Sequence, residues 1–343
     1  MRLTDRIKGF LRIPVRVKTQ TASHKRGPVT HVIILDGTMS SLDPGEETNA
    51  GLTYRLLCAA PAGARLSLRY EQGVQWVRWR EIMNVVEGRG INRQIRRAYG
   101  FLASRYRPGD QIFLFGYSRG AYAVRSLAGV IDRIGLVKPK YATVRHIRDA
   151  YRHYQNDPEA DIAKAFSKRF CYDNVPIEMV GVWDTVKALG LRLPFSGSWR
   201  ASQHDFHSHR LGRSVKNGFH ALAHDEARDA YAPVLWETRD NWNGRLEQVW
   251  FRGTHGDIGG HLGGFDAARP LSNIPLVWLL EKAETCGLTL PENWAGQFTQ
   301  DVAAPSVGSL RGWGKIFFVR RARAVGQDPS ESLHPSLAEY RAR

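Results

Sequence analysis

The chain has 343 residues, of which 43% are hydrophobic and 10 are tryptophans. This composition excludes wholesale disorder and suffices for one large α/β domain or two smaller ones. The formal net charge of +16 indicates an anionic partner (acidic membrane lipid, nucleic acid or an anionic substrate) or an arginine-rich soluble surface. The sequence has no zinc-finger spacing, RNP pattern or heptad-linked basic region, so no motif supports nucleic-acid binding.

The three cysteines, Cys58, Cys171 and Cys286, lie far apart and form no CxxC motif. They predict a reducing compartment, with neither a disulfide framework nor a thiolate metal site, and we expect no cofactor. No apolar run approaches the roughly 20 residues that a membrane span needs, and no apolar signal segment follows the basic amino terminus. We expect a cytoplasmic protein, with peripheral contact to an anionic membrane or export without a cleaved signal as alternatives.

The first half of the chain alternates between predicted strands and helices. Residues 1–27 are expected to form a basic N-terminal arm. Its start could be a short helix on an anionic membrane. Because Pro14 cuts this helix short, the alternatives are a helix that docks on its own domain and a frayed tail. In chain order we then predict a strand at Thr30–Leu35, a helix at 49–60, a strand near 65–70, a long loop at 71–90, a helix at 91–106 and an apolar strand that ends at Gly116.

The second half continues this alternation, which predicts an α/β fold with a doubly wound, mostly parallel sheet and lid or loop insertions. Residues 28–287 would form the catalytic domain, and residues 288–343 a C-terminal extension that packs on it or follows it. Here we predict helices at 141–156, 218–231 and 274–286, strands at 175–182 and 246–251, a lid loop at 189–208 and a glycine-rich loop at 253–264.

Ser118 lies between two glycines in the run Gly116-Tyr117-Ser118-Arg119-Gly120. A predicted strand ends there and a helical pattern begins at once, so the run matches the Gly-x-Ser-x-Gly nucleophile elbow. In such a turn the serine backbone is strained, and the glycines let strand and helix approach without Cβ clashes. The alternative is an ordinary strand–helix junction whose serine caps the helix.

A serine hydroxyl needs a base to take its proton, and histidine suits this task near neutral pH. In elbow-type hydrolases the chain order is Ser, then Asp or Glu, then His. Ser118, Asp184 and His255 follow that order, and each comes after a predicted strand. We predict that they form the catalytic triad, with Asp257 as the competing partner of the histidine and His261 as the reserve base.

The developing oxyanion needs backbone N–H donors near the serine. We expect one from Arg119 and a second from Gly37 or Thr38, in the loop after the first strand. Asp36 is interpreted as an organiser of that loop, because a carboxylate facing the oxyanion would oppose catalysis. The side chains of Arg119 and Arg125 either attract an anionic headgroup or form salt bridges within the domain.

Several histidines have spacings that metal sites also use. His220 and His224 are four residues apart on a predicted helix, and the alternative is packing or surface histidines. A metal-assisted hydrolase built on Asp36, Asp184, His255 and Asp257 is a further reading. A lid cluster is open to the same two interpretations, metal ligands or solvated side chains; it consists of His204, His207 and His209.

The chain resembles the α/β-hydrolase domain typified by type VI secretion phospholipase effectors. The resemblance implies a serine hydrolase that acts on lipid or acyl esters, with Ser118, Asp184 and His255 on the triad motifs. It departs from the family where Met39 and Ser40 follow Thr38 in place of Trp-Asn, and where 288–343 stands in place of a large membrane-docking region. The matching segments are 32–38, 70–74, 88–136, 181–186 and 250–260.

Two functions from different classes follow from these observations. The first is a serine hydrolase of lipid esters (phospholipase, lipase or esterase) that works through an acyl-enzyme. The second is a non-catalytic α/β-hydrolase-like module that binds anionic membrane or nucleic acid through its basic surface. Loss of activity on replacing Ser118 separates them, because only the first function needs the hydroxyl.

Overall fold

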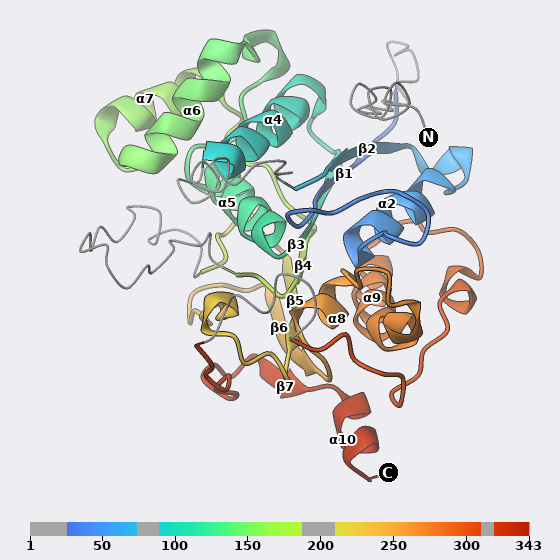
Figure 1. Cartoon of the computed structure of the whole chain (residues 1–343). Coiled ribbons are helices and arrows are strands. Elements are labelled where there is room, and N and C mark those ends of the chain that lie inside the picture. Colours follow the sequence, from blue (N-terminus) through green and yellow to red (C-terminus); the bar gives the residue numbers. More distant parts are fainter. Residues whose placement is uncertain (1–25, 74–88, 187–209, 310–318, 343) are drawn as a thin grey trace, which may run out of the picture.

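The computed structural model describes residues 26–73, 89–186, 210–309 and 319–342 (Figure 1). Its centre is a 7-stranded sheet in the order β2-β1-β3-β4-β5-β6-β7, and all the paired neighbours run parallel. The strands are β1 (Thr30–Leu35), β2 (Leu66–Glu71), β3 (Gln111–Tyr117), β4 (Met179–Trp183), β5 (Asn217–Ala223), β6 (Arg245–Phe251) and β7 (Glu331–Leu333).

Helices cover both faces of this sheet (Figure 1). The group α4 to α7 lies on one face, and α2, α8 and α9 lie on the other. The predicted α/β fold with a doubly wound sheet is therefore confirmed. The helices are α2 (Asn49–Cys58), α4 (Arg89–Arg105), α5 (Arg119–Arg133), α6 (Val144–Asn156), α7 (Asp161–Phe170), α8 (His255–Gly259), α9 (Arg269–Thr285) and α10 (Pro335–Ala342).

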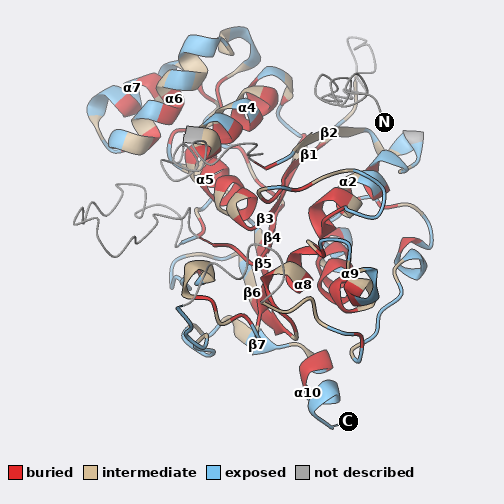
Figure 2. Cartoon of the chain, in the orientation of Figure 1, coloured by how far each residue is buried: buried red, intermediate tan, exposed pale blue. Residues whose placement is uncertain are grey.

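The alternation of side chains along β1 shows how two cores arise from one sheet. Ile33 and Leu35 pack among the residues of α4 to α7, whereas Val32 and Ile34 pack among those of α2 and α9. All four side chains are fully buried, and Figure 2 shows the strands buried between the two helical layers. A strand covered on both faces is apolar throughout, which explains why its sequence lacks polar alternation.

The strand order places the site in the sheet. The chain runs from β1 outward to β2 and then crosses back to β3 on the other side of β1. Loops leaving the carboxyl ends of β1 and β3 therefore diverge, which opens a crevice there for a ligand. The loop after β1 begins at Asp36 and the loop after β3 contains Ser118, so both border this crevice.

The predicted helix at 218–231 is wrong, because the segment begins with the interior strand β5 and contains no α-helix. Phe219, Ala221 and Leu222 are fully buried there, so the segment is apolar on both sides. A short apolar run is compatible with either a buried strand or a buried helix, and periodicity alone does not distinguish them. The predicted 253–264 loop contains the short helix α8 (His255–Gly259), and α7 (Asp161–Phe170) was not predicted.

The segment after α9 takes part in the sheet. Its strand β7 pairs with β6, with Gln248 opposite Glu331, and the Trp250 indole donates to the Glu331 carboxylate at 2.8 Å. Figure 1 shows β7 at the sheet edge and α10 beyond it. The part of the chain predicted as a C-terminal extension thus supplies an edge strand.

Some predicted segments lie wholly or mostly outside the described residues. These are the arm at 1–27 apart from its last two residues, most of the loop at 71–90, and the lid at 189–208 with its histidines. Arg26, the first described residue, forms an ion pair with Asp110 at 2.7 Å. No helix in the described ranges is long and apolar enough to cross a membrane.

The glycine at the start of α5 fixes how closely that helix approaches β1. A Cβ on Gly120 would lie 2.1 Å from the carbonyl oxygen of Leu35 and 2.5 Å from that of Asp36. We expect Gly120→Ala to lower the free energy of unfolding by about 3 kcal/mol, the upper end for overpacking, because backbone atoms cannot move aside. Urea denaturation measures this loss.

Gly63→Ala is the matched control. Gly63 is exposed in a short turn, and a Cβ there would meet no atom within 4 Å. It should change the unfolding free energy by less than about 0.5 kcal/mol. Equal losses in the two variants would contradict the steric explanation.

Candidate active site

The turn between β3 and α5 presents Ser118. Its φ of 58° is positive, a strained backbone conformation for a residue with a Cβ. The Ser118 N–H donates to the carbonyl oxygen of Trp183 at 3.0 Å, which ties the turn to the end of β4. Its hydroxyl makes no capping bond at the start of α5. The structure thus does not use this serine as a helix cap, and its hydroxyl contacts His255 instead.

His255 is the first residue of α8, and its neighbours fix that helix start. The Asp257 carboxylate accepts hydrogen bonds from the N–H and the hydroxyl of Thr254 at 2.7 and 2.8 Å. The His255 ring has Nε2 at 2.9 Å from Ser118 Oγ and Nδ1 at 2.6 Å from Asp184 Oδ2. Because an ionised carboxylate can only accept, Nδ1 donates to Asp184 and Nε2 accepts from the serine hydroxyl.

Two tyrosine rings hold the imidazole from its sides. The centroids of Tyr117 and Tyr231 lie 5.0 and 4.7 Å from that of His255. The Tyr117 hydroxyl donates to the His255 carbonyl oxygen at 3.1 Å, and the His255 N–H donates to Glu226 Oε2 at 3.2 Å. The ring is therefore fixed through its faces and its backbone as well as through its two nitrogens.

Asp184 follows β4 with a φ of 40° and is fully buried. Its Oδ1 accepts a hydrogen bond from the Ala223 N–H at 3.0 Å. Arg323 donates from Nη1 to Oδ1 at 2.6 Å and from Nη2 to Oδ2 at 2.9 Å. Burial alone would raise the pKa of Asp184, but the Arg323 charge and the hydrogen bonds from His255 and Arg323 hold that pKa below its usual range. The carboxylate therefore stays ionised at neutral pH.

Arg323 is the contact that the sequence did not predict. It lies between β6 and β7 in the chain order, and its guanidinium also donates to the carbonyl oxygens of Ala223 at 2.8 Å and Tyr231 at 2.6 Å. The sequence offers it only as one basic residue beside Arg320 and Arg321. Its pairing with a carboxylate 139 residues earlier depends on tertiary structure, and no local pattern marks it.

The predicted oxyanion donors lie next to the nucleophile. Arg119 opens α5, and N–H groups in the first turn of a helix have no partner within the helix. A Cβ on Gly37 would lie 3.4 Å from Ser118 Cβ, so the loop after β1 touches the serine. However, the Gly37 N–H donates to Asp36 Oδ1 at 2.6 Å. That bond occupies the Gly37 N–H, so of the two predicted candidates for the second donor only the Thr38 N–H is still a candidate.

The Asp36 carboxylate is engaged inside its own loop. Its Oδ2 accepts the hydroxyls of Thr48 and Tyr70, both at 2.6 Å. Burial raises the pKa of Asp36 to about 6 against these hydrogen bonds. Together with the bond from Gly37, these contacts engage both carboxylate oxygens and connect the loop after β1 to α2 and β2.

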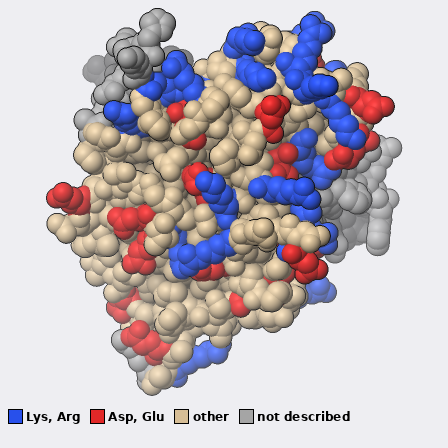
Figure 3. Space-filling view, turned by 180° about the vertical axis from the view of Figure 1, so that it is seen from behind, with Lys and Arg blue, Asp and Glu red and all other residues tan. Residues whose placement is uncertain are grey.

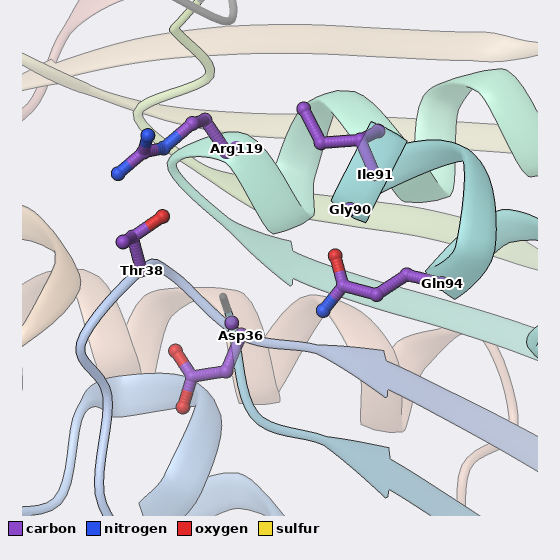
Figure 4. Close-up of a pocket in the computed structure, with 7 residues that line it drawn as sticks. Asp36, Thr38, Gly90, Ile91, Gln94 and Arg119 are labelled. Carbon is purple, nitrogen blue, oxygen red and sulfur yellow. The ribbon is translucent and has the colours of Figure 1, made fainter. Parts of the chain in front are cut away.

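A hollow opens beside the elbow (Figure 4). Figure 4 shows Thr38 and the Arg119 side chain on one side of it and Ile91 and Gln94 on the other, with the Asp36 carboxylate directed away from Arg119. It is lined by Asp36, Thr38, Gly73, Gly90, Ile91, Gln94 and Arg119.

Residues 30–282 match the family described as "T6SS, Phospholipase effector Tle1-like, catalytic domain". The chain belongs to this family. The resemblance to type VI secretion phospholipase effectors is thereby confirmed. The match includes Ser118, Asp184 and His255 and ends before Arg323.

The similarity of this Tle1-like domain to individual proteins is partial. It is 27% identical over 194 residues to the uncharacterized protein YEL023C of Saccharomyces cerevisiae, covering 50% of this chain and 28% of that protein. An uncharacterized protein from Pseudomonas aeruginosa has a similar structure, at 15% identity and a TM-score of 0.45 over 80% of this chain and 49% of that one. The structure of the Tle1 effector bound to the VgrG spike of the Type 6 secretion system is similar at 16% identity and a TM-score of 0.32. This similarity covers 68% of this chain and 51% of that one. The chain thus spans about half, or less, of the proteins it matches.

Asp257, the competing partner of the histidine, has other contacts in this Tle1-like domain, and the backbone N–H of His261, the reserve base, donates to the Gly256 carbonyl oxygen at 2.9 Å. Besides Thr254, the Asp257 carboxylate accepts the Ser306 hydroxyl at 2.5 Å and the Val307 N–H at 2.8 Å. Burial and the neighbouring His255 lower the pKa of His261. The structure brings Ser118 to His255 and brings His255 to Asp184, and it uses Asp257 within the loop.

The metal-type spacing of His220 and His224 has a different explanation. His220 lies on β5, where its Nε2 accepts the Thr185 N–H at 3.0 Å, and burial lowers its pKa to about 3. His224 follows the strand and contacts Asp225 at 2.7 Å. Across the described ranges, no group of three or more His, Cys, Asp or Glu side chains could hold a metal ion.

The ion pair of Arg323 with Asp184 predicts a large stability effect. In Arg323→Met a buried carboxylate loses its bidentate partner, so we expect the free energy of unfolding at neutral pH to fall by about 3–5 kcal/mol. Denaturant unfolding measures it. Arg321→Met, which removes an exposed charge close by in the chain, is the control and should change stability by less than about 0.5 kcal/mol.

The same loss should shrink at acid pH. In the wild type the pKa of Asp184 lies below its ordinary value of 3.8, so its stabilising contribution is present above that pH and is lost as the pH falls through the lowered pKa. In Arg323→Met, the burial of Asp184 is no longer balanced by the arginine charge and raises its pKa. As the pH falls, the carboxyl therefore becomes neutral at a higher pH than in the wild type. A stability difference that stays constant from about pH 7 to about pH 3 would contradict this account.

Proposed function

We propose that this Tle1-like domain is a serine hydrolase that cleaves carboxylic esters of lipids through an acyl-enzyme. The observation that carries the proposal is the continuous chain of hydrogen bonds from Ser118 through His255 to Asp184, at 2.9 and 2.6 Å. Membership of a phospholipase effector family supports lipid esters as the substrate class. The strained Ser118 backbone supports the same assignment, because an elbow turn presents a nucleophile.

Acylation follows from the direction of these hydrogen bonds. Ser118 Oγ attacks the acyl carbonyl carbon while His255 Nε2 takes the hydroxyl proton. The ionised Asp184 stabilises the imidazolium that forms, and the N–H groups of Arg119 and Thr38 donate to the oxyanion. When the tetrahedral intermediate collapses, the ester C–O bond breaks and His255 Nε2 gives its proton to the leaving alcohol. Ser118 then carries the acyl group.

Deacylation repeats these steps with water. His255 Nε2 takes a proton from a water molecule, whose oxygen attacks the acyl carbon. His255 then returns the proton to Ser118 Oγ as the acyl–serine bond breaks, and a fatty acid leaves. The hydroxyl is restored without a metal ion or cofactor in any of these steps.

Replacing the nucleophile is the direct test. Ser118→Ala should lower hydrolysis of phospholipids and short acyl esters by about 10⁴- to 10⁶-fold and should abolish labelling by a fluorophosphonate probe. Ser104→Ala, at an exposed serine near the end of α4, is the control and should leave both unchanged. Equal labelling of Ser118→Ala and wild type would refute the serine mechanism and favour the non-catalytic module.

The basic surface supports a peripheral contact with anionic membrane. On the face seen in Figure 3, Lys and Arg gather toward the top and across the middle, and Asp and Glu are scattered between them and toward the lower left. With a net charge of +16, such a surface attracts anionic lipid through a salt-sensitive interaction.

Vesicle sedimentation tests this contact. The protein should sediment with phosphatidylglycerol vesicles more than with phosphatidylcholine vesicles, and this difference should shrink as the NaCl concentration rises. Equal sedimentation with both would contradict this contact.

A further inference from the structure

We propose that the Arg119 guanidinium is the subsite that binds the phosphate diester of a glycerophospholipid substrate. Arg119 immediately follows Ser118 in the chain. A group bound by its side chain is therefore held close to the ester that the serine attacks. The inference rests on the proposed function and adds to it the residue that selects phospholipids over neutral esters.

The first support is a buried guanidinium nitrogen of Arg119 that has no acceptor. Its Nη1 is buried and has no hydrogen-bond partner among the described residues. Other buried arginines donate to acceptors through their terminal nitrogens: Arg125 to backbone carbonyls near Trp236, Arg228 to Glu226, and Arg323, whose Nε alone lacks a partner, to Asp184. A buried charge without a partner costs free energy, and a bound anion removes that cost.

The second support is where the guanidinium lies. Burial lowers the pKa of Arg119, and the nearby phenols of Tyr231 and Tyr117 act against that effect. Both tyrosines also pack on the ring of His255. The guanidinium therefore lies near the two tyrosines that pack on this ring, and Arg119 lines the hollow beside the elbow together with Thr38.

The surroundings favour an anion. Arg119 begins the 15-residue helix α5, whose first turn contains no acidic residue, so the positive end of the helix dipole is not neutralised there. The nearest lining acid of the hollow is Asp36, but Gly37, Thr48 and Tyr70 occupy its oxygens. Figure 4 shows its carboxylate pointing away from Arg119.

A phosphate diester suits this position chemically. The planar guanidinium offers parallel N–H donors that match two phosphate oxygens. In a glycerophospholipid the phosphate and the acyl esters share one glycerol backbone. A serine and an arginine at adjacent positions can therefore engage both groups of one molecule.

The test compares two substrates with the same acyl chains, dihexanoylphosphatidylcholine and dihexanoylglycerol. For wild type and Arg119→Met, the measured quantity is the ratio of kcat/KM for the phospholipid to kcat/KM for the neutral ester. We expect Arg119→Met to lower this ratio by about 10- to 100-fold. This is the fold-change that corresponds to the loss of one charge-assisted hydrogen bond. Arg119→Lys keeps the charge and should recover part of the ratio.

Two controls separate this inference from the function it rests on. Fluorophosphonate labelling of Arg119→Met shows that its serine is intact; if the variant does not fold, Arg119→Lys is compared with wild type instead. Arg148→Met, which removes an exposed charge on α6, should leave the ratio unchanged. Failure of the wild type to hydrolyse either ester would refute the proposed function. A wild type that hydrolyses both, with the same ratio in Arg119→Met, would refute the phosphate subsite alone.

Inorganic phosphate distinguishes a lipid headgroup from a free anion. It should compete weakly with dihexanoylglycerol in the wild type and less so in Arg119→Met. If phosphate inhibits the wild type through Arg119 but the substrate ratio does not change in Arg119→Met, the guanidinium binds free anions only, and the proposal is overturned.

Discussion

The buried charge of Asp184 is the constraint on which the site depends. A carboxylate with no exposed surface must be compensated by donors, and Asp184 obtains them from three separate segments: the end of β5, the start of α8 and the chain before β7. Each donor ties one of these segments to the carboxyl end of β4. The compensation keeps Asp184 ionised, which fixes the tautomer of His255 and leaves Nε2 free to accept from the serine. Stability and chemistry are thus coupled through one side chain.

This coupling explains why a residue after the family match contacts the candidate active site. The matched region ends at residue 282, yet Arg323 supplies the cation that balances Asp184. The segment that carries Arg323 leads into β7, which adds to the sheet beside β6. Sheet pairing anchors the segment, and the anchored segment positions the guanidinium. The two arginines therefore have different partners: Arg323 pairs with Asp184, the acid of the proposed triad, and Arg119, in our proposal, holds the substrate phosphate.

The parallel sheet accounts for the convergence of the remaining groups. Loops at the carboxyl ends of β1, β3, β4 and β6 lead to Asp36, Ser118, Asp184 and His255, and parallel strands put all four loops at one edge. Because the strands are apolar and each loop begins with a polar residue, this convergence could be predicted from the sequence. The type of one element was harder to predict. The composition of β5 suits a buried helix as well as a buried strand, and only its pairing with β4 and β6 makes it a strand.

The sequence by itself determined the alternation of strands and helices, the elbow at Ser118 and the order Ser, Asp, His, because these depend on local periodicity, on glycines beside a turn and on spacing. Tertiary structure alone decided which side chains meet. It paired His255 with Asp184 and not with Asp257. It also bonded the Gly37 N–H to Asp36 and brought Arg323 to Asp184. Contacts of this kind arise when distant segments pack together, and the chain has no local pattern that encodes them.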